Sequence, residues 1–168
     1  MAKFPRVASL KTYQQFVGRL AELGIELPCD QEVLQGEDSP LAQPLDVDGF
    51  SIGNRFAILP MEGWDGTKEG KPTELTRRRW RNFGISGAKL IWGGEAVAVE
   101  HLGRANPGQL WLHNDNTQTF AALREELVEQ HEQAMGDSEG LLVGLQLTHS
   151  GRFARPNEKA KLEPQMLY

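Results

Sequence analysis

The sequence predicts an α/β fold of parallel strands joined by helices. Three short apolar segments, at residues 56–59, 90–92 and 141–147, are separated by two stretches in which apolar residues follow helical spacing. Strands that alternate with amphipathic helices pair in parallel through right-handed crossovers. The glycine pattern G-x-G-x-x-G of a dinucleotide-binding sheet does not follow the first strand. These observations are compatible both with an open doubly wound sheet and with a (β/α) barrel.

Residues 1–43 are predicted to be a helical extension followed by a linker. Ser9 is placed to cap a helix and Gly24 to end it, and one face of this helix carries Phe16, Val17, Leu20 and Leu23. Residues 28–44 are rich in acidic residues and prolines, which is typical of a linker.

A second region, residues 44–168, begins with a predicted β-hairpin. Apolar and polar residues alternate over residues 45–52 around Asp48-Gly49, which is a strong hairpin signal. The apolar segment 56–59 ends at Pro60 and is predicted to be a buried strand.

Thr73 is predicted to cap the first crossover helix, whose apolar positions are Leu75, Trp80 and Phe83. The strand 90–92 should stop at Gly93-Gly94, and a long loop should occupy residues 94–116.

Asn116 or Thr117 is predicted to cap the second crossover helix. Gly136 should end it, and its apolar stripe is Phe120, Leu123, Leu127, His131 and Ala134. The strand 141–147 is almost entirely aliphatic, as expected for a parallel strand covered on both faces.

Composition excludes several classes of protein. The 168 residues suit a single domain, and the net charge of −5 argues against general nucleic-acid binding. Residues 76–81 are rich in arginine, but at helical spacing Trp80 faces the core and most of the arginines face water.

The cysteine, histidine and hydropathy patterns exclude further classes of protein. The single cysteine, Cys29, excludes an internal disulfide and a Cys-rich metal site. None of the four histidines forms an H-x(3)-H pair, so no metal site is expected. No apolar segment approaches the ~20 residues of a membrane span, and no signal peptide is evident. We therefore expect a cytoplasmic protein with no membrane partner.

Gln146 is the one polar side chain within the apolar segment 141–147. A buried amide without partners costs ~1–3 kcal/mol, so this side chain must be bonded to something. Its donors and acceptor match the edge of a pyrimidine-like ring, and a core glutamine bonded to nearby backbone is the alternative.

Three motifs in this order resemble the Old Yellow Enzyme family of FMN-dependent NADH:flavin oxidoreductases. They are Asn54-Arg55-Phe56 with Pro60-Met61, then Glu95-Ala96, then the segment from Gln146 to Arg152 that reads QLTHSGR. The resemblance covers residues 44–168 and leaves the N-terminal extension outside it.

The resemblance implies a TIM barrel with FMN at its top. It places Pro60 and Met61 along the isoalloxazine, Ala96 near its reactive edge, Gln146 at its pyrimidine end and Trp64 beside the substrate. The implied reaction passes a hydride from NAD(P)H through FMN to an activated alkene or a similar small-molecule electron acceptor. His149 and Arg152 belong to the motif, without an assigned contact.

Glu62 departs from the family pattern. It follows Pro60-Met61, where relatives commonly carry Thr or Cys against the flavin. A carboxylate beside the ring disfavours the electron-rich reduced flavin. Glu62 is therefore expected to be protonated, turned away, or lowering the flavin potential.

A TIM barrel needs ~250 residues and eight strands, whereas only three crossover-linked strands are predicted up to residue 147. We therefore expect the N-terminal portion of a longer enzyme, with the catalytic proton donor beyond residue 168. In the 168-residue chain by itself, the helices should cover one face of the sheet and leave the face meant for the barrel interior open. The chain is therefore expected to be inactive and prone to self-association, which allows a homo-oligomer. The alternative function is a non-catalytic partial barrel that serves as an interaction module or is a truncated product.

Overall fold

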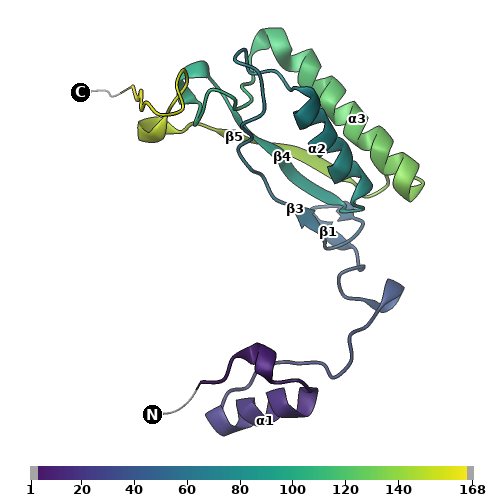
Figure 1. Ribbon diagram of the computed structural model, residues 1–168. Helices are drawn as coiled ribbons and strands as arrows, with labels where there is room; N and C mark the ends of the chain where they lie inside the picture. Colours follow the sequence, from purple (N-terminus) through teal and green to yellow (C-terminus); the bar gives the residue numbers. More distant parts are fainter. Residues whose placement is uncertain (1–3, 166–168) are drawn as a thin grey trace. The chain divides into compact units, whose positions relative to one another are not determined.

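The computed structural model describes residues 4–165, which form two compact units (Figure 1). The first unit ends at Ser39 and the second begins at Pro40. Each unit is described separately below.

The first unit is organised around one amphipathic helix, α1 (Tyr13–Leu23). Thr12 caps it, since its hydroxyl accepts a hydrogen bond from the Gln15 N–H at 3.2 Å. The prediction that Ser9 caps this helix is wrong, because Ser9 ends a separate 3-10 turn, η1 (Val7–Ser9). Gly24 ends α1 in the left-handed conformation at φ 64°, as predicted. A further 3-10 turn, η2 (Gly36–Asp38), lies near the end of this unit.

The second unit opens with the predicted hairpin, β1 (Leu45–Val47) and β2 (Phe50–Ile52). Asp48 and Gly49 both have positive φ, at 49° and 85°. This pair of conformations is the type I′ turn that the right-handed twist of two strands favours.

A three-stranded parallel sheet follows, in the order β3 (Ala57–Ile58), β4 (Leu90–Ala98), β5 (Leu142–Thr148). The crossovers are α2 (Glu74–Ile85) and α3 (Thr117–Met135). The predicted β-α-β-α-β order is therefore confirmed. Among the residues described, the outer edges of β3 and β5 have no neighbouring strand.

The β4 strand is longer than predicted, since it continues through Gly93-Gly94 to Ala98. Its register with β5 shifts between Trp92 and Ala96, and Gly93 has a φ of 59°. Glycine tolerates this conformation, so the backbone bulges there and then resumes pairing. The segment predicted to begin a loop thus contains the second half of a strand, and the connection after it carries two 3-10 turns, η3 (His101–Gly103) and η4 (Asn114–Asn116).

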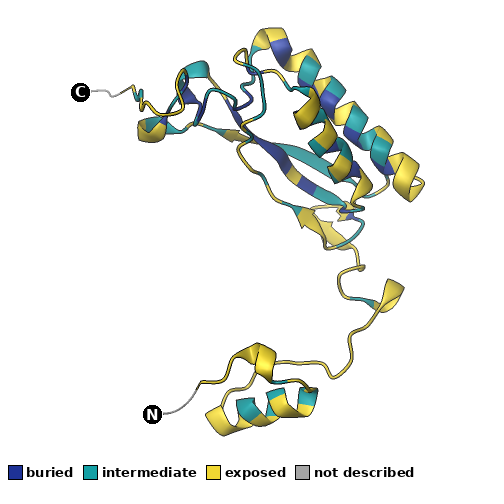
Figure 2. Ribbon diagram, in the orientation of Figure 1, coloured by how far each residue is buried: buried dark blue, intermediate teal, exposed yellow. Residues whose placement is uncertain are grey.

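Helices α2 and α3 pack side by side on one face of this sheet and bury the core there (Figures 1 and 2). Thr73 begins α2 in a capping box with Thr76, and Gly136 ends α3 in the left-handed conformation, both at the predicted positions. Most of the predicted helical apolar positions lie in this core, but Leu75 and Ala134 are exposed. The core contains Trp80, Ile91, Val97, Leu110, Phe120, Leu123 and Leu127.

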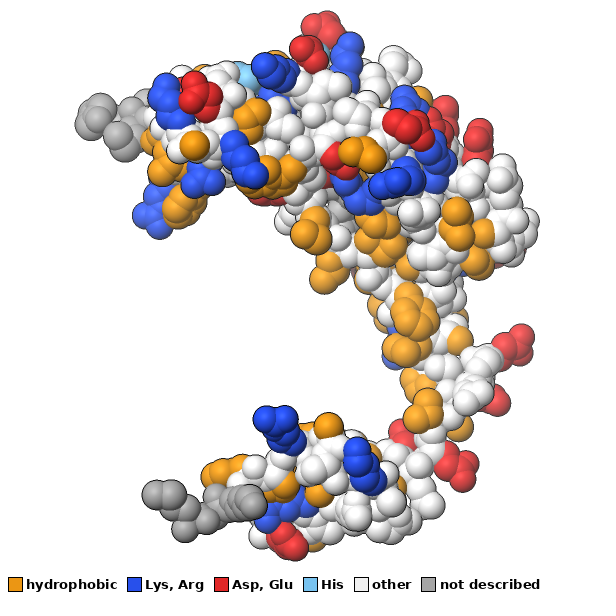
Figure 3. Space-filling model, in the orientation of Figure 1, with side chains coloured by type: hydrophobic (Ala, Val, Ile, Leu, Met, Phe, Trp, Pro, Cys, Tyr) orange, Lys and Arg blue, Asp and Glu red, His pale blue; other side chains and the backbone are white. Residues whose placement is uncertain are grey.

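The opposite face of the sheet lies open within residues 40–165. Leu59 and Trp92 are 69% and 52% exposed, whereas Ile91 next to Trp92 is fully buried. Hydrophobic side chains gather along the side of this unit that faces away from α2 and α3 (Figure 3). The aliphatic segment 141–147 is therefore covered on one face only within residues 40–165, as expected for three strands that do not close a barrel.

Candidate functional site

Because β3, β4 and β5 are parallel, their carboxyl ends meet at one edge of the sheet. In barrel enzymes the catalytic groups come from this edge and from the loops that follow it. Here those loops are residues 59–73, 99–116 and 149–165, and the last contains the 3-10 turn η5 (Gly151–Phe153).

The structure brings four of the predicted site residues together at this edge. A Cβ built on Gly93 would lie 2.9 Å from the Cβ atoms of both Pro60 and Gln146, so these two residues flank the bulge. The Ala96 N–H donates to the Met61 carbonyl at 3.0 Å, and Ala96 pairs with Gln146 across the sheet. Residues from three separate sequence segments thus form one cluster.

Gln146 is exposed, which corrects the prediction of a buried amide. Its neighbours Val143 and Leu145 pack against the helix-covered core, so at this position β5 turns the amide towards the open face. No hydrogen bond joins this side chain to any other residue between 4 and 165. The amide is therefore available to a ligand.

Ala96 is only 3% exposed and both of its backbone groups have partners. Its N–H bonds Met61, and its carbonyl accepts from the Gln109 amide at 2.9 Å. Ala96 therefore joins the end of β3 to the loop after β4. A hydrogen bond from its N–H to a ligand would need the bond to Met61 to break.

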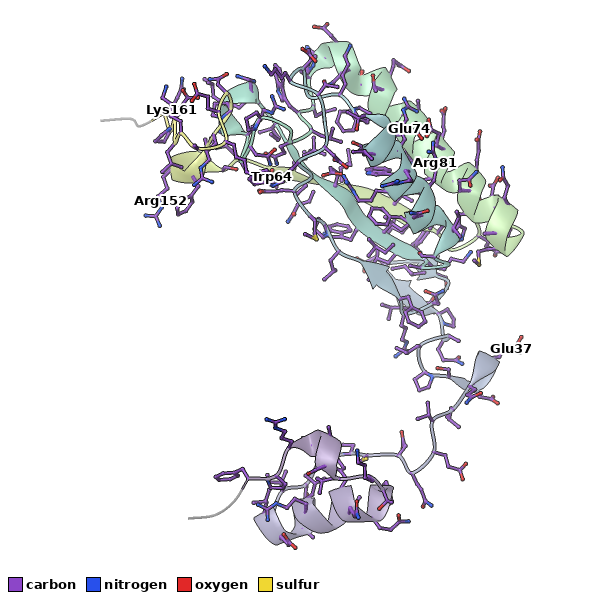
Figure 4. The ribbon with its side chains drawn as sticks, viewed as in Figure 1. Glu37, Trp64, Glu74, Arg81, Arg152 and Lys161 are labelled. Atoms are coloured by element: carbon purple, nitrogen blue, oxygen red, sulfur yellow. The ribbon has the colours of Figure 1, made fainter. Side chains whose placement is uncertain are left out.

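The loop after β3 borders a pocket of ≈ 340 Å³ lined by Met61, Glu62, Gly63, Trp64, Asp65 and Arg79. Met61 is 76% exposed, and Glu62 is exposed as well. Trp64, labelled in Figure 4, is half exposed. The Lys159 ammonium lies 4.6 Å from the centroid of its ring. The loops after β3 and β5 meet through this cation–π contact.

A cluster of charged side chains next to this loop was not predicted from the sequence. Glu95 is fully buried in β4, and Arg79 on α2 forms ion pairs with both Glu95 and Asp65. Glu95 also accepts the Gly63 N–H at 2.6 Å. Burial raises the pKa of the Glu95 carboxyl above its ordinary value, and Arg79 and the Gly63 N–H counteract part of that rise.

A second buried polar group organises the loop after β4. Arg104 is fully buried, and its guanidinium donates to the backbone carbonyls of four residues: Thr67, Lys68, Pro107 and Gln109. The Gln109 amide also donates to the Thr148 hydroxyl at 3.2 Å, as well as to Ala96. No periodicity in residues 94–116 signals these contacts, since each depends on loop backbone brought together by the fold.

The remaining motif residues lie in the loop after β5. His149 Nδ1 accepts the Gly151 N–H at 3.0 Å, so Nε2 carries the proton that bonds Glu100 at 2.7 Å. Arg152 lies against the ring of Phe153 (Figure 4). Within residues 4–165 no three His, Cys, Asp or Glu side chains are grouped as a metal site.

Neither a protein-family model nor a curated protein matches the sequence. The old yellow enzyme from Trypanosoma cruzi is 22% identical over 68% of this chain and 28% of its own, with a TM-score of 0.51. The described sheet and helices have the fold of an Old Yellow Enzyme segment.

Two other solved structures share this Old Yellow Enzyme segment. A 2-naphthoyl-CoA reductase in complex with 2-naphthoyl-CoA is 18% identical over 70% of this chain and 16% of its own, with a TM-score of 0.54. Morphinone reductase in complex with tetrahydroNAD is 24% identical over 70% of this chain and 29% of its own, with a TM-score of 0.51. The matched residues span less than a third of each of these proteins. The predicted barrel-type fold is thus confirmed for part of a barrel, and the residues described do not close one.

No helix within residues 4–165 has the length and hydropathy needed to cross a bilayer.

Proposed function

We propose that this chain belongs to the Old Yellow Enzyme family and supplies the flavin-ring side of an FMN-dependent NAD(P)H oxidoreductase. The single observation that carries the proposal is the exposed Gln146 amide beside Pro60 and Met61, on the open apolar face of a sheet with this fold. Bound FMN would supply hydride transfer from NAD(P)H to an activated alkene or a similar acceptor.

The residues present fit the ring system of FMN. A flavin ring needs apolar contact over its faces and hydrogen bonds at its pyrimidine end. Met61, Leu59 and Trp92 offer exposed apolar surface, and the Gln146 amide offers both donors and an acceptor. Glu62 and Trp64 border the same edge, where Trp64 would contact the substrate.

The described residues do not offer a matching site for the FMN phosphate. In barrels this site is frequently built from the loops after strands 7 and 8, and three parallel strands are described here. We therefore propose that further strands complete the barrel and supply the phosphate site and the proton donor. A second copy of the chain is one way to cover the open face, and the homo-oligomer remains a proposal.

A flavin titration of the 168-residue chain tests the proposal. The chain should be colourless and without NAD(P)H oxidase activity as purified. It should bind lumiflavin and FMN with equal, weak affinity, because it contributes ring contacts alone. Gln146→Leu should weaken both by ~1–3 kcal/mol, or about 5- to 150-fold, because ring hydrogen bonds lose their partner.

Gln118→Leu is the matched control, since Gln118 is an exposed glutamine on α3, and it should leave flavin affinity unchanged. The proposal would be contradicted if neither flavin bound, or if wild type and Gln146→Leu bound each flavin with the same affinity. The first result would favour the alternative function, a partial barrel without catalysis.

A further inference from the structure

Charged side chains form hydrogen bonds and ion pairs with the loop after β3, and the proposed flavin contacts do not explain their role. Trp64 lies between two fixed neighbours. The Gly63 N–H donates to Glu95 and the Gly63 carbonyl accepts from the Asn106 amide at 3.2 Å, so both backbone groups of Gly63 are paired. On the other side, the Asp65 carbonyl accepts the Thr73 hydroxyl at 2.6 Å.

Arg79 connects these two anchor points. One guanidinium nitrogen faces Asp65, and the other faces Glu95 and also donates to Asp65 at 3.2 Å. Arg79 comes from α2, whereas Glu95 comes from β4. A planar guanidinium forms such paired contacts with two carboxylates, and an ammonium on a flexible stem does not.

The space around Gly63 shows how tightly this loop is enclosed. A Cβ on this residue would collide with the Glu95 carboxylate and would lie 2.8 Å from an Arg79 nitrogen. The loop therefore passes directly over the ion pairs, with no room for a side chain between them. Its exposed side chains, Met61 and Trp64, line the adjoining pocket, which Asp65 and Arg79 also border.

We propose that Asp65, Arg79 and Glu95 form a positioning unit that fixes Met61 and Trp64 at the carboxyl edge of the sheet before any ligand binds. The inference rests on the proposed function only for the identity of the ligand, since the rigidity of the loop is a property of the chain itself. Glu95 lies outside the pocket lining, and the unit acts on Met61 and Trp64 through the Gly63 and Asp65 backbone. It keeps the apolar and aromatic surface of the pocket in one conformation, so that binding does not have to order it.

Arg79→Lys tests the unit, and Arg81→Lys is its matched control. Arg81 lies two residues further along α2 and pairs with the exposed Glu74 (Figure 4) and, at 3.5 Å, with Glu126 on α3, so it contacts no residue of the loop after β3 in an ion pair. Hydrogen exchange at the Gly63 amide reports whether its hydrogen bond to Glu95 is formed. The ¹⁹F signals of a chain labelled with 5-fluorotryptophan report the order of the loop at Trp64 and of the core at Trp80. The full 168-residue chain is used, without ligand.

In wild type and Arg81→Lys the Gly63 amide should be protected and the Trp64 signal sharp. In Arg79→Lys the Gly63 amide should exchange at least about tenfold faster and the Trp64 signal should broaden, while the Trp80 signal stays unchanged. Asp65→Asn, which leaves Glu95 paired, should show the same pattern in weaker form.

Three results would overturn the inference. These are fast Gly63 exchange already in wild type, no difference between the two lysine variants, and equal changes at Trp64 and Trp80, which would indicate a role in overall stability. Flavin titration of the same variants is read separately. If no variant binds flavin, the proposed function fails while the exchange data still decide the role of the unit.

Discussion

The two faces of the parallel sheet carry side chains of the same apolar kinds but differ in what covers them. On one face, Ile91 and Val97 are fully buried beneath α2 and α3. On the other, Trp92 and Leu59 lie more than half exposed, although Trp92 directly follows Ile91 in β4. The covered face is complete within residues 40–165, whereas the open face has a large apolar surface without an intramolecular partner among them.

This difference separates residues that hold the fold together from residues that remain available. Apolar surface of this kind, bordered by polar groups such as the Gln146 amide, is typical of binding surfaces. Substitutions on the two faces should therefore have separate effects. Changes on the covered face should alter stability, and changes on the open face should alter binding.

Trp80→Ala and Trp92→Ala give the largest expected contrast. Trp80 is 1% exposed and lies in the core, so its truncation should cost about 3–5 kcal/mol of unfolding free energy. Trp92→Ala should change that free energy by less than about 0.5 kcal/mol, because its ring is already half in water. Denaturant unfolding followed by circular dichroism measures both, and equal losses would mean that the open face is covered in solution.

Gly84→Ala examines how closely α2 and α3 approach each other. A methyl group there would collide with the Leu127 carbonyl and would lie 3.1 Å from the backbone nitrogen of His131. Overpacking costs about 1–3 kcal/mol, which exceeds the gain of up to about 1 kcal/mol in helix propensity. The variant should therefore be less stable in denaturant.

Gly18→Ala is the control for this substitution. Gly18 lies within α1, and a Cβ there meets nothing within 4 Å, so the change should not destabilise the helix. If Gly84→Ala were as stable as wild type, the close approach of the two helices would be contradicted.

His131 should make the covered face sensitive to acid. Its Nδ1 bonds the Gly84 carbonyl at 3.0 Å, and its Nε2 has no partner among the residues described. Burial lowers the pKa of the imidazole below its ordinary value of 6.5, and the Gly84 carbonyl opposes part of this shift. Between the lowered pKa and 6.5, the unfolded chain binds more protons than the folded one, so stability falls as the pH falls through this range.

The measurement is the free energy of unfolding from about pH 7.5 to about pH 5.5. Wild type should lose more stability over this interval than His131→Gln, whose amide still donates to Gly84 but does not titrate. Parallel pH profiles would show that His131 is solvated in the folded state.

The covered face was predictable because its signals are local. Helical spacing identified Trp80, Leu123 and Leu127 as core residues, and all three are buried there. The hairpin followed from Asp48-Gly49 for the same reason, since a turn depends on adjacent residues.

The errors fall where a residue's surroundings come from distant segments. Gln146 was predicted to be buried because its segment is aliphatic, but burial of a strand depends on what covers both faces. The β4 strand was predicted to stop at Gly93, whereas pairing with β5 continues past the bulge. Buried Glu95 depends on Arg79 and on Gly63, 16 and 32 residues away, and no pattern in the sequence joins them.

Amide and indole chemical shifts of the 168-residue chain, recorded by ¹H–¹⁵N NMR while lumiflavin is added, show which face of the sheet binds the flavin ring. We expect saturable shifts at the open face, in the Trp92 indole, the Gly144 amide and the Gln146 side-chain amide. The Trp80 indole and the His131 amide on the covered face should remain unchanged. Shifts spread equally over both faces, or confined to the covered face, would contradict the assignment of the open face as the ligand-binding surface.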